Sequence, residues 1–247
     1  MIKFFRKIRY GLMDKNKTGK YLKYAIGEIV LVVIGILFAL QINNWNESIK
    51  DSKYEHYILK EIANNLVADE IQIQQIIIQR LKTQKSIKRM RNYLKTQEID
   101  KDTFAYDLGQ LFTFERYFPI RTAYEISKSR GLPFSNPALR TQIANYYEYE
   151  QSKVQSSIKD IENVFLNEFQ GVFEKHISDS EYGEYVTFEK YPSPTLNEWV
   201  LKKLIPFRLN NFETIKKVGT FQKLSIELIE TVNNALHMGD SSSVKNN

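Results

Sequence analysis

The sequence of 247 residues predicts an all-α protein in which a single N-terminal transmembrane helix precedes an antiparallel helical bundle. One apolar stretch, residues 25–42, is long enough to cross a bilayer, and most of the later chain repeats apolar residues at helical spacing. We expect four parts, namely a basic segment (1–24), the transmembrane helix (25–45), the helical-bundle domain (46–237) and a disordered tail (238–247).

The apolar stretch reads AIGEIVLVVIGILFALQI. Its eighteen residues give roughly 27 Å of helix at about 1.5 Å each, close to the thickness of a hydrocarbon core. Tyr21, Tyr24 and Trp45 flank it, where aromatic rings prefer the membrane interface. A buried helix of a soluble protein and a cleaved signal peptide are the alternatives. The apolar core is too long for a signal peptide, and no small-residue cleavage pattern follows it.

Charge predicts the orientation of this helix. Residues 1–24 hold eight basic side chains and one acid, whereas the other residues hold 27 basic and 28 acidic side chains. We therefore assign the sequence pI of about 9.2 to the N-terminal segment and expect no nucleic-acid partner. The positive-inside rule places the N-terminus in the cytoplasm and residues 46–247 across the membrane. The basic segment is either a short amphipathic helix on anionic lipid or a disordered tail that orients insertion.

Two groups near the span are candidate contact sites. The first comprises small or ionisable residues within the span, Gly27, Glu28, Gly35 and Ala39. Small residues four apart let helices approach closely, and a carboxylate in a membrane is either a polar contact or a side chain that reaches back to the interface. The second is a membrane-exit patch of Asn43, Asn44, Trp45 and Asn46, which either binds a partner or only anchors the helix at the interface.

The periodicity beyond the span predicts seven segments. Apolar residues at Ile58, Ile62, Leu66, Ile73, Ile77, Leu81 and Ile87 indicate a helix over 54–94, continuous with the span. We expect further helices at 102–114 with Asp102 as its cap, 121–129, 136–176 with Pro137 at its first position, 195–204 and 212–236. Residues 178–194 predict a loop that contains either a short hairpin or an extended excursion. Three long antiparallel helices would form the bundle.

The sequence offers little for catalysis. It has no cysteine and three histidines, and no glycine-rich phosphate loop or HExxH motif occurs. We interpret acidic pairs such as Asp69–Glu70 and Glu148/Glu150 as solvated helix positions, and we expect no metal or other cofactor. Eight aromatic residues are either core packing or the lining of a pocket: Phe112, Phe114, Tyr117, Phe118, Tyr124, Tyr146, Tyr147 and Tyr149.

Two motifs resemble a known family. GEIVLVVIGILFALQINNWNE (27–47) is similar to the GEIxLVVIGIxxALQxNNWNE block of domain of unknown function 6090, a Bacteroidota family of single-pass membrane proteins. TAYEISKSRGLPFSNPALRTQIANYY (122–147) is a looser match, and Lys128–Gly131 departs from the usual Ser-Gly ending. The resemblance implies an anchor in the bacterial inner membrane and a periplasmic helical domain, and it carries no activity, ligand or catalytic residue.

These observations favour a non-enzymatic interaction domain, a scaffold, adaptor or assembly factor, whose partners are the lipid bilayer and a protein or a second copy of the chain. A ligand-sensing four-helix domain is the alternative. A sensor would need a separate transducing partner, because the cytoplasmic side offers only 24 residues. An unrecognised hydrolase or transferase is the third possibility.

Overall fold

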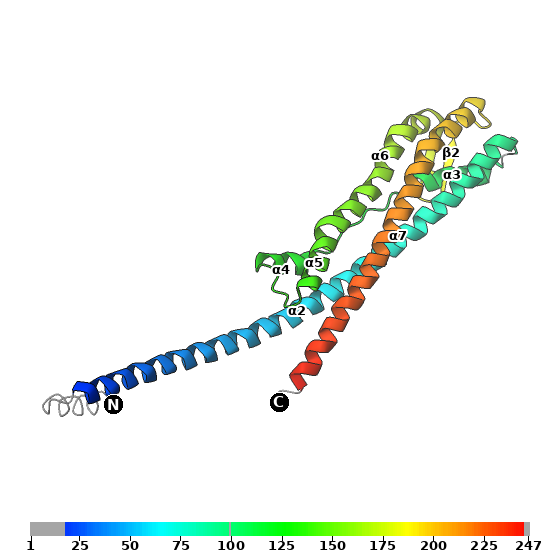
Figure 1. Cartoon of the computed structure of the whole chain (residues 1–247). Helices are drawn as coiled ribbons and strands as arrows, with labels where there is room; N and C mark the ends of the chain where they lie inside the picture. The colour runs from blue at the N-terminus through cyan, green and yellow to red at the C-terminus, as the bar shows by residue number, and fades with distance from the viewer. Residues whose placement is uncertain (1–17, 99, 245–247) are drawn as a thin grey trace. The chain divides into compact units, whose positions relative to one another are not determined.

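Helices make up most of the computed structural model, which describes residues 18–98 and 100–244, with side chains for 22–98 and 100–238 (Figure 1). The elements in chain order are α2 (Thr18–Thr96), α3 (Lys101–Gly109), the 3-10 turn η1 (Gln110–Phe112), α4 (Thr122–Ser129), α5 (Pro137–Asn145), the π-helical turn η2 (Tyr146–Glu150), α6 (Gln151–His176), β1 (Ile177–Glu181), β2 (Tyr185–Phe188) and α7 (Pro194–Val244). The all-α prediction is confirmed. The basic segment over 1–17 lies outside the described residues.

The chain divides into two units, Met1–Tyr54 and Glu55–Asn247, and α2 contributes to both. This division falls after Tyr54, later than the expected boundary at residue 45. In the first unit, every side chain from 22 to 53 is exposed except that of Ala25, which is half-buried. The apolar run is the one helical segment of the described residues that is long and apolar enough to cross a membrane. The predicted continuity of this helix through residues 46–53 is confirmed.

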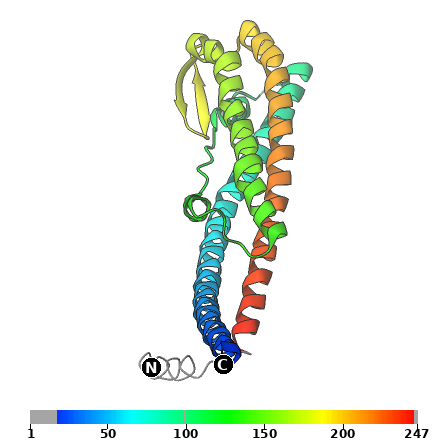
Figure 2. The same ribbon diagram turned by 60° about the vertical axis from the view of Figure 1, so that its left-hand side comes forward.

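Three long helices form the second unit: residues 55–96 of α2, α6 and α7. Figure 2 shows α6 beside α7, and a hydrogen bond from Thr214 Oγ1 to the carbonyl of Ser157, at 3.1 Å, joins them. Gln222 of α7 donates to Glu70 of α2 at 2.6 Å. Further along α2, the side chain of Asn211 donates to the carbonyl of Arg80 at 3.3 Å. Because the earlier α7 residue meets the later α2 residue, these two helices run antiparallel.

The relation between α2 and α6 differs from the prediction. Asp69 of α2 bonds to Gln151 at the start of α6, and Met90 shares a core cluster with Phe169 near its end. These two helices are therefore parallel, and only α7 opposes them. The physical reason is the connection over residues 97–136, which carries the chain back to the end of the unit where α2 enters it.

This connection contains the short helices α3 and α4 and ends where α5 begins. Side chains next to the first turns of α3 and α5 determine where these helices start. Asp100, rather than the expected Asp102, caps α3 by accepting a hydrogen bond from the Thr103 backbone N–H at 2.8 Å. An extended stretch leads to α4. The side chain of Asn136 then accepts from the N–H of Ala138 at 2.9 Å, and Pro137 occupies the first position of α5, as predicted.

A hairpin follows α6 and leads into α7, which is one long helix. Strands β1 and β2 pair antiparallel around Gly183, whose φ of +73° suits a residue without a side chain, so the predicted hairpin is confirmed. The expected break between residues 204 and 212 is wrong, because α7 continues through Pro206. The neighbouring Leu204 and Phe207 are fully buried, and their packing offsets the hydrogen bond that proline cannot donate. Helix α7 reaches Val244, so residues 238–244 are helical rather than disordered; residues 245–247 are outside the described part.

Candidate functional site

The candidate residues of the span lie on the exposed N-terminal part of α2. Gly27, Gly35 and Ala39 follow one another at four- or eight-residue spacing and so share a helical face, with Glu28 beside the first. A Cβ built at Gly27 or Gly35 meets no atom within 4 Å. This stripe is therefore smooth and uncovered in the single chain, and whether a second helix packs on it stays a prediction.

The membrane-exit patch is also exposed. The Trp45 side chain is 68 % exposed, and those of Asn43, Asn44 and Asn46 are exposed as well. Asn43 Nδ2 donates to Glu47 Oε1 at 3.2 Å, one helical turn further on. The Asn43 amide thus already has a partner within the helix.

Two buried polar clusters were not predicted from the sequence, and Asp69 is the centre of the first. Its side chain is fully buried in the face of α2 that packs on the other helices. Its carboxylate accepts hydrogen bonds from the Tyr117 hydroxyl at 2.9 Å and from the Ile120 backbone N–H at 3.0 Å. Gln151 Nε2 adds a third, at 3.1 Å. Burial raises the pKa of the Asp69 carboxyl, and these three hydrogen bonds oppose that shift. The interpretation of Asp69 as a solvated acid is wrong.

Aromatic rings surround this carboxylate. Tyr124 stacks on Tyr147 with 4.5 Å between ring centroids, and Tyr146 stacks on Phe221 at 4.9 Å. Burial raises the pKa of Tyr124 to about 12, and it raises the pKa of Tyr146 and Tyr147 further. The rings join α4, η2 and α7 into one layer, in which Tyr117 also contacts Phe221.

These contacts decide between core packing and a pocket for most of the eight aromatic residues. Six are buried or half-buried against other rings or core residues: Phe112, Phe114, Tyr117, Tyr124, Tyr146 and Tyr147. Phe118 and Tyr149 are 68 % and 59 % exposed and belong to the surface. Core packing is therefore the main role of this set.

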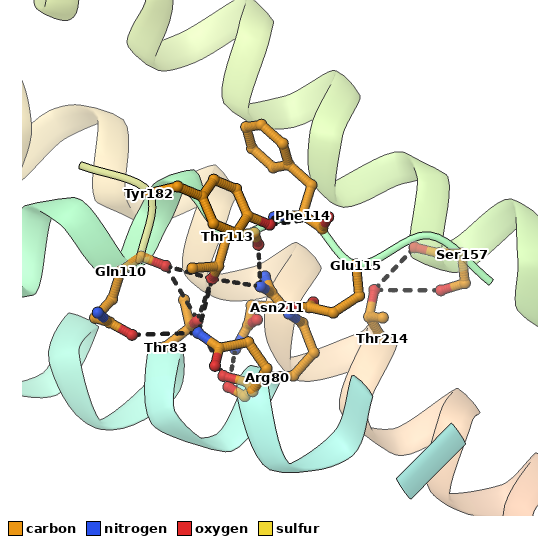
Figure 3. Close-up of polar contacts among 11 residues, drawn as sticks. Arg80, Thr83, Gln110, Thr113, Phe114, Glu115, Ser157, Tyr182, Asn211 and Thr214 are labelled. Carbon is orange, nitrogen blue, oxygen red and sulfur yellow. Dashed lines mark hydrogen bonds and ion pairs between the residues drawn. The ribbon is translucent and has the colours of Figure 1, made fainter. Parts of the chain in front are cut away.

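Arg80 is the centre of the second cluster (Figure 3). Its side chain is 1 % exposed, and its Nε lies 2.9 Å from Glu115 Oε2. Nη2 donates to the carbonyl and hydroxyl of Thr113, the latter at 2.8 Å. Gln79 and Thr83 also bond to the Thr113 hydroxyl. Burial lowers the pKa of the Arg80 guanidinium, which the charge of Glu115 opposes.

Both clusters do the same mechanical task, since each fixes the extended stretch of the connection to α2. Thr113 and Glu115 bond to Arg80, and Tyr117 and Ile120 bond to Asp69. The spacing of residues in α2 contains a signal that could have predicted the burial of Asp69 and Arg80. Eleven of the fourteen buried residues in the described part of α2 follow alternating spacings of three and four: Leu59, Ile62, Leu66, Asp69, Ile73, Ile76, Arg80, Thr83, Ile87, Met90 and Leu94. This is the spacing of a coiled-coil seam, and three polar residues interrupt it.

A basic surface lies at the end of the second unit where α2 terminates. Residues 71–97 carry seven basic side chains and no acid, which the near-zero charge of the remaining chain concealed. The net positive charge of the chain still comes from residues 1–24, but the balanced remainder contains this second cationic cluster, which the total charge does not reveal. A hollow of about 560 Å³ opens here between α2 and α7, lined by Gln84, Lys85, Ile87, Lys88, Arg91, Arg208, Leu209 and Phe212. A second hollow of about 570 Å³ adjoins it and shares Lys85, Lys88 and Arg91.

Among the described residues, no group of three His, Cys, Asp or Glu side chains is placed to hold a metal ion. The His176 ring packs edge-on against Trp199 with 5.8 Å between centroids, and burial lowers its pKa. Of the expected acidic pairs, Glu148 is exposed and bonds to Lys128 at 2.8 Å, an ordinary surface ion pair.

Comparison with known proteins places the chain in a family. No curated protein and no solved structure matches it. A family model, described as a family of unknown function, matches residues 28–177, from the span to the end of α6. The matched region contains the first family-like motif from residue 28 onward, the whole of the second motif and both buried polar clusters. The chain therefore belongs to the DUF6090 family.

Proposed function

We propose that this protein is a membrane-anchored helical interaction domain, a scaffold, adaptor or assembly factor without catalytic activity. The N-terminal part of α2 is its anchor in the bacterial inner membrane. The N-terminus lies in the cytoplasm, and the second unit lies in the periplasm, where it binds a protein partner.

One observation supports the proposed membrane anchor most strongly. A predominantly apolar window of 18 residues in α2 has none of its residues buried within the chain. Exposed apolar surface of that extent is costly in water, so a bilayer or another apolar partner must cover it. The basic flank of residues 1–24 supports the orientation, because cationic loops remain cytoplasmic.

The use of the buried polar groups supports binding rather than catalysis. The carboxylate of Asp69 and the guanidinium of Arg80 face donors and acceptors of the chain itself, so they hold the connection in place. Unpaired cations gather instead on the surface, at the basic end of α2, where Lys85, Lys88 and Arg91 line two adjoining hollows. A surface of this kind suits recognition of a partner.

Affinity purification tests this proposal. The tagged full chain, cross-linked in membranes and purified in a mild detergent, is expected to retain a protein partner in stoichiometric amount, identified by mass spectrometry. A chain that returns alone, or with a small molecule and no protein, would contradict the interaction domain. The second result would favour the ligand-sensing alternative.

Substitutions on the span distinguish partner binding through the span from partner binding through the second unit. Gly35→Ile with Ala39→Ile places bulk on the smooth face and is expected to reduce cross-linking through the span at least fivefold while leaving insertion intact. Val33→Ile with Leu37→Ile, near the opposite side of the same helix, is the matched control and should change little. Equal cross-linking of the two variants would show that the stripe is passive.

A further inference from the structure

The groove between α2 and α7 is the surface feature of the second unit that most clearly calls for a ligand. Its floor is apolar, because Ile87 is buried beneath it and the Leu209 and Phe212 side chains are each 54 % exposed at its α7 side. Lys85, Lys88 and Arg91 line its α2 side. No acidic residue is among those that line it.

The cations of this groove are unpaired. Within the described part of the chain, the side chains of Lys85, Lys88, Arg91 and Arg208 make no ion pair and no hydrogen bond. The Nε of Arg208 is buried and has no hydrogen-bond partner. By contrast, Arg89 on the same turns of α2 is paired with Asp107. A buried donor without a partner is costly. The Arg208 residue as a whole is half-buried, so an arriving anion would pair with the accessible part of its guanidinium rather than with the buried Nε.

The dimensions of the groove select among anions. From Lys85 to Arg91 the cations that line the groove span about 9 Å of helix at about 1.5 Å per residue, and Lys95 of the adjoining hollow extends the cationic row to about 15 Å. A single phosphate or carboxylate would engage only a fraction of that row. A nucleic acid would contact the cations but leave the apolar floor uncovered, and a flat lipid surface does not fill a groove between two helices. An amphipathic helix with acidic flanks matches the length, the floor and the charge together.

We infer that the α2–α7 groove binds an acidic amphipathic helix of a protein partner. The apolar side chains of that helix would cover Leu209 and Phe212, and its carboxylates would pair with the row of Lys85, Lys88 and Arg91 and with Arg208. This inference rests on the proposed function, to which it adds the class of partner and its docking site.

A peptide titration tests the groove directly. The full chain is held in nanodiscs of zwitterionic phosphatidylcholine and titrated with a fluorescent 18-residue peptide that has a leucine face flanked by glutamates. Its affinity is expected to exceed that of the same peptide with glutamine for glutamate at least tenfold, and to fall at least tenfold between 50 mM and 300 mM salt, because the contacts are exposed ion pairs.

Charge reversal locates the binding site. Lys85→Glu, Lys88→Glu and Arg91→Glu together are expected to weaken binding of the acidic peptide at least tenfold and to create binding of a peptide with lysine in place of glutamate. The gain of binding shows that the variant is folded. Lys60→Glu, Lys159→Glu and Lys223→Glu, three exposed positions on α2, α6 and α7, carry the same charge change and should alter affinity less than twofold.

The contradicting outcomes are distinct. Equal affinity for the acidic and glutamine peptides, or equal losses in the two triple variants, would overturn the inference. So would self-association of the chain through the groove, or binding of phosphatidylglycerol vesicles without binding of the peptide. If the cross-linked partner stays bound to the groove-reversed variant, the groove assignment fails while the interaction domain stands. Absence of any partner would instead overturn the proposed function.

Discussion

Replacing Asp69 by leucine is expected to lower the free energy of unfolding of the second unit by about 3 kcal/mol or more. Leucine has a similar volume, but it accepts no hydrogen bond. The Tyr117 hydroxyl, the Ile120 N–H and the Gln151 amide would then lose the acceptor that all three share in the interior. Each buried donor left unpaired costs about 1–3 kcal/mol. Urea unfolding of the full chain in mild micelles, followed by circular dichroism, measures the change.

Two variants bracket this prediction. Asp69→Asn keeps one acceptor oxygen and is expected to lose less stability than the leucine variant. Glu227→Leu removes an exposed acid from α7 and should change stability by no more than about 0.5 kcal/mol. A loss for Asp69→Leu that is no greater than the loss for Glu227→Leu would show that the Asp69 cluster does not hold the connection.

Removing Glu115 alone is expected to cost about 3 kcal/mol, because it leaves the Arg80 guanidinium buried without its counter-charge. Replacing both residues, Arg80→Met with Glu115→Leu, should cost at least about 2 kcal/mol less than the sum of the two single changes. The reason is that the double variant has no uncompensated buried charge, although the Thr113 carbonyl still loses the donor that Arg80 supplies. The same urea unfolding measures all three variants. Additivity within about 0.5 kcal/mol would show that the two charges are independent.

Features that depend on neighbouring residues in the chain were predicted well. The apolar span, the start of a helix at Asn136–Pro137 and the hairpin after His176 each follow from local chemistry, and the structure contains all three. The continuity of the span with residues 54–94 follows from the absence of glycine and proline in that run, and α2 confirms it.

Features that depend on packing were predicted less well. Leu81, assigned to the apolar face, is 41 % exposed, whereas Arg80 beside it is buried. An apolar-only pattern misses such positions, because the seam of α2 is set by spacing and not by residue type. Similarly, Pro206 does not end α7 because its neighbours pack in the core. Three of the four hydrogen-bond partners of Asp69 lie 48 to 82 positions away in sequence, which periodicity cannot relate; the fourth, Gln72, lies on the next turn of α2.

The basic groove shows a further limit of prediction from the sequence, which concerns the distribution of charge. A near-zero net charge over residues 25–247 said nothing about how that charge is distributed, and seven cations concentrate on residues 71–97. A charge count in a sliding window would have found this segment. Such a count would not have shown that this basic segment faces Leu209 and Phe212 across the groove. That arrangement depends on the antiparallel packing of α2 and α7, which are distant in sequence.

Reporter fusions to the C-terminus of the full chain test the central claim, that the span anchors a domain outside the cytoplasm, most directly. Alkaline phosphatase folds to an active form only outside the cytoplasm, and a suitable fluorescent protein becomes fluorescent only inside it. With the reporters at the C-terminus, we expect phosphatase activity without fluorescence. With the same reporters at the N-terminus, we expect fluorescence without phosphatase activity. Fluorescence without phosphatase activity at the C-terminus would contradict it.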